Sequence, residues 1–150
     1  MIDARRAGDM SGLEFLGAIA AGEIPQPPIG HLIGMRLVEV GEGTATFVLD
    51  PHESHYNPIG SVHGGIIATA CDSAGSCAIH STLPRGAGYG TIDLKVGYLR
   101  PVTADTGRLW SRGEVIHVGG RLGTAAVRLE DESGRVYAYA TVTCLVTRPS

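Results

Sequence analysis

The chain of 150 residues has few aromatic side chains and little charge. Phe, Trp and Tyr make up 5% of it, and charged residues 18%, with a formal net charge of −3. It contains no basic tract, so the composition gives no support to nucleic-acid binding. It also lacks an apolar run long enough to span a bilayer, and the charged-then-apolar start of a signal peptide. We therefore expect a soluble, cytoplasmic protein that does not bind membranes.

Cysteine is scarce as well. Cys71, Cys77 and Cys144 are odd in number, lie among apolar neighbours and show no Cys-x-x-Cys or Cys/His spacing. This pattern favours buried free thiols in a reducing compartment over disulfides. The six histidines have no companions at metal-ligand spacing. We expect neither a metal site nor a cofactor.

The apolar residues, 43% of the chain, are enough for one core. Residues 1–28 are expected to form a leader and a short helix, which Ser11 and Glu14 begin as a capping box. The proline cluster at 25–28 predicts an extended linker after this helix. Residues 29–150 are expected to form a single domain.

Within that domain the hydrophobic pattern predicts an α+β fold. A hairpin is expected from residues 35–40 and 43–49, and a long helix from residues 64–82. Alternating apolar and polar residues then predict four strands, at 90–99, 106–117, 124–130 and 136–146. The connections are too short for crossover helices, so the strands should be antiparallel. We expect a curved sheet of about six strands around one central helix, whose small residues let other backbone approach closely.

The start of the long helix carries the most informative residues. His63, Gly64 and Gly65 precede an apolar run that contains one carboxylate, Asp72. A helix N-terminus offers unpaired N–H groups suited to a developing oxyanion, and a carboxylate on an apolar helix needs a partner or a function. Together they suggest acyl chemistry. The plainer alternatives are that the glycines only allow close packing and that Asp72 is structural. Cys71 is expected to be a core residue, because no base is arranged for it.

The spacing also bears on oligomeric state. Asp72 lies eight residues beyond Gly64, which is about 12 Å along a helix axis. A reacting carbon must lie about 3 Å from both the nucleophile and the oxyanion donor. One helix cannot supply both groups to one carbonyl, whereas two antiparallel copies can. The motif therefore predicts a homo-oligomer with shared sites.

Two segments of the chain form a combined motif: Asn57-x5-His63-Gly64-Gly65-x6-Asp72, and Gly90-Thr91-Ile92-Asp93-Leu94 with Tyr98-Leu99-Arg100-Pro101. With these motifs, the chain from Ile29 to Val146 resembles the hotdog-fold acyl-CoA thioesterases, in particular the PaaI-like and Them2-like branch. The resemblance implies a hotdog fold and acyl-CoA hydrolysis at sites shared between subunits, with coenzyme A as part of the substrate.

The resemblance also implies roles for individual residues. The Gly64 N–H and the Asn57 side chain would polarise the thioester carbonyl, and Asp72 would act as general base or nucleophile. Thr91 would hold the water or the carboxylate, although a threonine on a strand is also simply a β-former. His63 would order the Asn57 loop.

Further residues are assigned to substrate binding. They are Gly65 and Tyr98 within the motifs, and Arg100 and Arg121 near strand ends. For the two arginines there are two interpretations: contact with coenzyme A phosphates, or simple exposure to water. Asp93 is expected on the same face as Thr91 by strand alternation, with a structural role.

The leading function is hydrolysis of an acyl-CoA to a carboxylic acid and coenzyme A. The alternatives are an acyl-CoA hydratase or dehydratase and a non-catalytic acyl-CoA-binding protein on the same fold. The sequence leaves open the acyl group, dimer against tetramer, and whether Asp72 is base or nucleophile.

Overall fold

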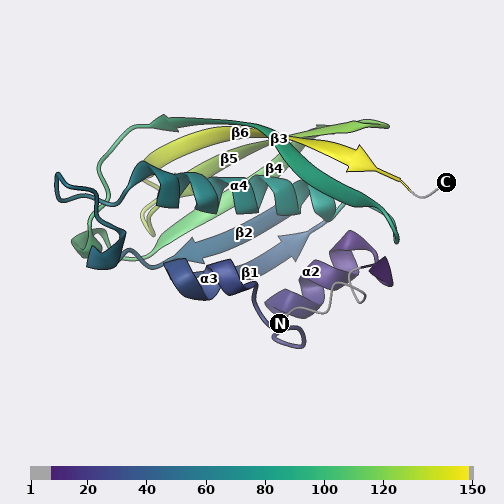
Figure 1. Ribbon diagram of the computed structural model, residues 1–150, viewed down its shortest axis with the longest axis horizontal. Coiled ribbons are helices and arrows are strands. Elements are labelled where there is room, and N and C mark those ends of the chain that lie inside the picture. Colours follow the sequence, from purple (N-terminus) through teal and green to yellow (C-terminus); the bar gives the residue numbers. More distant parts are fainter. Residues whose placement is uncertain (1–7, 149–150) are drawn as a thin grey trace.

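The computed structural model describes residues 8–148. Two short helices come first, and a hairpin, one long helix and four strands follow (Figure 1). The elements are α2 (Gly12–Ala20), α3 (Pro28–Ile33), β1 (Met35–Gly41), β2 (Thr44–Leu49), η1 (Glu53–His55), α4 (Gly64–His80), β3 (Gly88–Tyr98), η2 (Ala104–Thr106), β4 (Leu109–Val118), β5 (Leu122–Glu130) and β6 (Val136–Thr147). Within the described residues, no helix is both long and apolar enough to cross a membrane.

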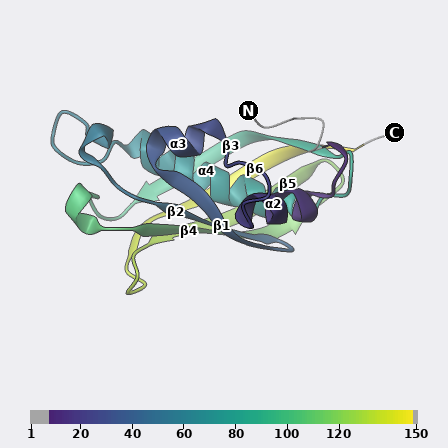
Figure 2. The same cartoon turned by 90° about the horizontal axis from the view of Figure 1, so that it is seen from below.

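The six strands form one antiparallel sheet in the order β1-β2-β4-β5-β6-β3. The two edges of the sheet are therefore β1 and β3. Helix α4 packs against all six strands and lies within the curve of the sheet (Figures 1 and 2). The predicted α+β architecture of a six-stranded sheet around a central helix is confirmed.

Small residues bring α4 close to the sheet, as the sequence predicts. A Cβ at Gly113 of β4 would overlap the Ala74 carbonyl of α4, and one at Gly75 would lie 2.5 Å from the Val142 side chain. The Ser111 hydroxyl donates to the Ala70 carbonyl at 3.0 Å, which gives this buried hydroxyl a partner. Glycine at both contact points lets helix and strand backbones approach without steric overlap.

The N-terminal helix begins as predicted. Ser11 is the N-cap of α2, and Ser11 and Glu14 make the reciprocal bonds of a capping box. Phe15, Leu16 and Ile19 of α2 are buried in the same core as the sheet. Most of the leader that the sequence predicts lies outside the described residues.

The expectation of an extended linker at the proline cluster 25–28 is wrong at its last residue, because α3 begins at Pro28. Proline suits the first helical turn, where its missing N–H costs nothing, and Gly34 ends the helix at φ +62°. Helices α2 and α3 both pack along β1.

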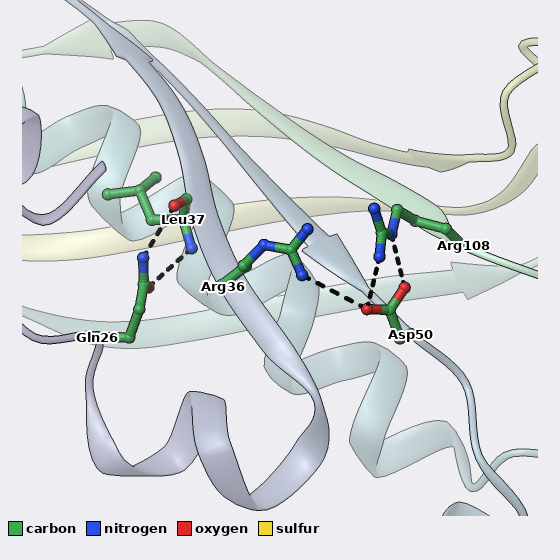
Figure 3. A network of polar contacts seen from close by, with 5 residues as sticks. All are labelled: Gln26, Arg36, Leu37, Asp50 and Arg108. Carbon is green, nitrogen blue, oxygen red and sulfur yellow. Dashed lines mark hydrogen bonds and ion pairs between the residues drawn. The ribbon is translucent and has the colours of Figure 1, made fainter. Parts of the chain in front are cut away.

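Two polar contacts fasten β1 to its surroundings (Figure 3). The Gln26 amide donates to the Leu37 carbonyl at 3.0 Å and accepts from the Leu37 N–H at 2.9 Å. Asp50, directly after β2, pairs with Arg36 at 3.5 Å and accepts from Nε and Nη2 of Arg108 at 2.6 and 3.0 Å. The Gln26 side chain thus makes the two backbone hydrogen bonds with Leu37 that a neighbouring strand would make on this side of β1.

A β-bulge corrects the predicted position of Asp93. Thr91 pairs with Cys144 of β6, but Asp93 pairs with the next residue, Thr143, so Ile92 is the extra residue. Because successive residues of a strand face opposite sides, Thr91 and Asp93 lie on opposite faces of the sheet. Thr91 faces α4, while Asp93 lies on the outer face. A second difference is that the predicted strand 106–117 begins only at Leu109, after the short helix η2.

Candidate active site

The start of α4 presents one free backbone donor. His63 is the N-cap, and its Nδ1 accepts from the Gly65 N–H at 2.9 Å. The His63 carbonyl accepts from the Ile66 N–H at 2.9 Å. Among residues 8–148, the Gly64 N–H has no hydrogen-bond partner. Of the two glycines, Gly64 is therefore the one whose N–H is available to an oxyanion.

Asn57 lies in the loop that leads to α4 and is held by that loop. Its Oδ1 accepts from the backbone N–H groups of Ile59 and Ser61 at 3.1 and 3.2 Å, and its Nδ2 donates to the Ser61 hydroxyl at 3.0 Å. One amide hydrogen of Nδ2 remains for another acceptor. The His63 backbone N–H donates to the His55 carbonyl at 2.7 Å, which ties the end of this loop to η1.

Asp72 and Thr91 meet where α4 lies beside β3. The Thr91 hydroxyl donates to Asp72 Oδ1 at 2.8 Å and lies 3.8 Å from Cys144 Sγ. Asp72 is half-buried and Thr91 is exposed. Within residues 8–148, Asp72 Oδ2 has no hydrogen-bond partner, and the Thr91 bond directs the carboxylate toward β3. Sequence reasoning missed Cys144 as a neighbour of this pair, because only the register of β3 on β6 brings it there.

Tyr98, at the far end of β3, lies over the helix start. Its hydroxyl donates to the Gly64 carbonyl at 2.8 Å. A cleft of about 350 Å³ opens beside this contact and is lined by Ser61, Gly64, Ile67, Tyr98 and Val102, among others. The free Gly64 N–H thus belongs to a residue that borders a cavity large enough for part of a small ligand.

The two arginines assigned to substrate binding lie far apart in one chain. Arg100 lines the cleft and donates to the Val136 carbonyl at the start of β6. Arg121 lies at the other end of β6, where its carbonyl accepts from the Val146 N–H. Ten residues of strand separate the two positions, about 33 Å. They do not meet at one site within a single chain.

The thiols near Asp72 are poor nucleophiles. Burial raises the pKa of the Cys71 and Cys77 thiols to about 12, and burial also raises the pKa of Cys144. Almost no thiolate is present near neutral pH, so a cysteine nucleophile has no support. Within residues 8–148, no cluster of three or more His, Cys, Asp or Glu side chains is arranged to hold a metal ion.

The residues singled out from the sequence thus form two groups on one helix. His63, Gly64 and Tyr98 meet at the start of α4, with Asn57 in the preceding loop, whereas Asp72 and Thr91 lie together two turns further on. Because α4 runs unbroken from Gly64 to His80, the groups are about 12 Å apart along its axis. Neither group alone contains both a base and an oxyanion donor.

Comparison with known sequences identifies the family. The sequence pattern of the thioesterase superfamily matches residues 59–138, more than half of the chain. The chain belongs to the thioesterase superfamily. The matched region contains the start of α4, Asp72, Thr91 and Tyr98.

Two curated relatives are named as thioesterases. The medium/long-chain acyl-CoA thioesterase YigI of Escherichia coli is 35% identical over 98 residues, which are 57% of this chain and 62% of YigI. The acyl-coenzyme A thioesterase 13 of Homo sapiens is 34% identical over 67 residues, 45% of this chain and 47% of that protein. The chain spans less than two thirds of the length of these two relatives.

Structural comparison identifies the fold. The PaaI protein of the E. coli phenylacetic acid degradation operon matches with a TM-score of 0.78 at 20% identity, over 95% of this chain and 99% of PaaI. The predicted hotdog fold and the resemblance to PaaI-like thioesterases are confirmed.

Proposed function

We propose that the protein is an acyl-CoA thioesterase that uses Asp72 on the acyl carbon and the Gly64 N–H on the carbonyl oxygen. The observation that carries the proposal is the Thr91–Asp72 hydrogen bond of 2.8 Å, which holds a half-buried carboxylate at the β3 edge. A carboxylate held in this way is suited to proton transfer or to direct attack. The names of YigI and of acyl-coenzyme A thioesterase 13 support a coenzyme A thioester as the substrate.

In the proposed reaction, Asp72 takes a proton from a water molecule whose oxygen attacks the thioester carbon. The carbonyl oxygen gains negative charge and is stabilised by the Gly64 N–H and by the free amide hydrogen of Asn57. The C–S bond then breaks, the acyl group leaves as a carboxylic acid, and the coenzyme A thiolate takes the proton from Asp72 and leaves as the thiol, which restores the carboxylate. In the nucleophilic variant, Asp72 forms an anhydride that water hydrolyses. A single turnover in H₂¹⁸O that places ¹⁸O in Asp72 would show the anhydride route with water attacking the aspartyl carbon, whereas ¹⁸O in the product acid alone fits the general-base route or water attack on the acyl carbon of the anhydride.

The active form is proposed to be a dimer that shares its sites. Two contacts fix how α4 lies against β3: Asp72 beside Thr91, and Gly64 beside Tyr98. A two-fold axis that brings Asp72 to Gly64 of a second copy must also bring Thr91 toward Tyr98 of that copy. The axis then crosses β3 midway between these residues, close to Leu94. Two copies pair antiparallel along β3, and their α4 helices lie side by side.

The β3 edge supports this pairing. In the part of the chain that the structure describes, strand β3 pairs with β6 alone; it is eleven residues long and contains no proline. Ile92, Tyr98 and the adjacent Leu99 are each more than half exposed. A long edge with exposed apolar side chains is a template for pairing with another strand.

The experiment measures release of free coenzyme A thiol from a panel of straight-chain and aromatic acyl-CoA substrates. Hydrolysis of at least one of them supports the proposal. Hydration of an enoyl-CoA without thiol release favours the hydratase alternative, and binding without turnover favours a non-catalytic binding protein. Either of these results would overturn the thioesterase assignment.

A further inference from the structure

Besides the hydrogen bonds of the helix itself, three contacts hold the two peptide groups at the start of α4. In the first, between His63 and Gly64, the carbonyl accepts from the Ile66 N–H at 2.9 Å. In the second, between Gly64 and Gly65, the N–H donates to His63 Nδ1 at 2.9 Å and the carbonyl accepts from the Tyr98 hydroxyl at 2.8 Å. The second peptide group has both of its polar atoms bonded, and the first has only its N–H free.

We propose that Tyr98 is a positioning residue for hydrolysis: its hydroxyl holds the Gly64–Gly65 peptide so that the Gly64 N–H faces the thioester oxygen. This inference rests on the proposed function. It also gives Tyr98 a different task from the substrate contact expected from the sequence.

The need for such a contact follows from the two glycines. Glycine has the largest backbone freedom of any residue, so two in succession leave the helix start poorly fixed. An oxyanion donor stabilises charge best when it is already oriented before the reaction. His63 contacts only the N–H of the Gly64–Gly65 peptide, and does so from two residues earlier in the chain. Tyr98 holds the carbonyl from a strand 34 residues away, and so anchors the helix start to the sheet.

The contact also explains why position 64 is a glycine. A Cβ placed there would lie 3.1 Å from the hydroxyl oxygen and from Cζ of Tyr98, closer than ordinary contact. Glycine at 64 therefore makes room for the phenol. Tyr98 pairs with Ala138 of β6, and both lie on the face of the sheet toward α4. The Tyr98 ring therefore points to the helix.

The phenol is suited to donate across the working range of pH. Desolvation raises the pKa of Tyr98 above its usual value of 10, so the hydroxyl keeps its proton in neutral and mildly alkaline solution. The hydroxyl can then donate to the Gly64 carbonyl, whereas a phenolate could only accept.

The test compares Tyr98→Phe with Tyr139→Phe, a control that removes a hydroxyl from an exposed tyrosine on the outer face of β6. Loss of an oxyanion donor itself costs about 10²–10³ in kcat, so loss of its support is expected to cost about 10-fold. For Tyr98→Phe we expect kcat to fall about 10-fold with KM within twofold of wild type, and for Tyr139→Phe we expect no change. A raised KM with unchanged kcat would mean that Tyr98 contacts substrate instead, and unchanged kinetics would mean that it positions nothing.

A second measurement does not depend on activity. Amide exchange of Gly65, followed by ¹⁵N NMR, is expected to be about 10-fold faster in Tyr98→Phe than in wild type or Tyr139→Phe, because the Gly64–Gly65 peptide then loses its hydrogen bond to the sheet and is held from within the helix alone. Unchanged exchange would overturn the inference even in an active thioesterase. Faster exchange in a protein that hydrolyses no acyl-CoA would retain the contact and overturn the proposed function alone.

Discussion

The two edges of the sheet differ in how they are covered. Along β1, helices α2 and α3 pack against the strand, and Gln26 takes both polar atoms of the Leu37 peptide (Figure 3). Along β3, the outward side of the strand has no such cover among residues 8–148, and Ile92 and Tyr98 are exposed. The candidate site residues Asp72, Thr91 and Gly64 all lie toward β3. In the proposed dimer, chemistry and association therefore meet at the β3 edge, while the contacts along β1 hold that strand in place.

The largest effect is expected at the β3 side. Asp72→Asn retains an oxygen that accepts from Thr91 but removes the negative charge. We expect normal folding and substrate binding with kcat reduced about 10²–10⁴-fold, the range for loss of a catalytic base. Thiol-release kinetics and circular dichroism measure both properties. Near wild-type kcat in this variant would show that Asp72 is structural.

An intermediate effect is expected from charging the β3 edge. Ile92→Lys places a like charge from each copy at the proposed interface. We expect the dissociation constant of the dimer to rise at least about 10-fold, that is by about 1.4 kcal/mol or more, with activity falling as monomer forms. Analytical ultracentrifugation measures the association. Ile116→Lys is the matched control, since Ile116 is exposed to a similar degree on β4. Equal association in the two variants, or an active monomer, would contradict pairing along β3.

The smallest effect on catalysis is expected at the β1 edge. Gln26→Ala removes two hydrogen bonds to Leu37, each worth about 1 kcal/mol. We expect the free energy of unfolding to fall by about 1–2 kcal/mol in urea titrations, with kcat within twofold of wild type. A large loss of kcat would mean that the β1 edge also affects the active site. This result would contradict the distinction drawn between the two edges.

Features that depend on residues close in sequence were predictable. The capping box at Ser11, the long helix after His63 and the strand alternation are all local patterns, and the structure confirms them. The small residues of α4 correctly predicted the close approach of helix and sheet, because short side chains leave little between the two backbones.

Features that depend on strand pairing were not predictable. The bulge at Ile92 exists only in the register of β3 on β6, so simple alternation placed Asp93 on the wrong face. The same register brings Cys144 beside Thr91, and the packing of β3 on α4 joins Tyr98 to Gly64.

Helix α3 was missed for a local reason. The proline cluster indicates extended chain, while Pro28 also suits a helix start.

The central claim is that Asp72 of one copy works with Gly64 of the other, and mixing two inactive variants tests it. One is Asp72→Asn, and the other is Gly64→Pro, which removes the N–H donor. Proline fits this first helical position, since His63 at φ −59° and ψ 134° already has the conformation that precedes proline. Gly64→Ala is the control, because it adds a Cβ near Tyr98 but keeps the N–H.

Each inactive parent dimer lacks one half of both sites. A mixed dimer has one site that lacks both halves and one that lacks neither. Random exchange makes half of the dimers mixed, so activity is expected to recover to about a quarter of wild type. No recovery, with folding and subunit exchange both verified, would mean that each chain carries a complete site and that Asp72 and Gly64 are not partners across the β3 edge.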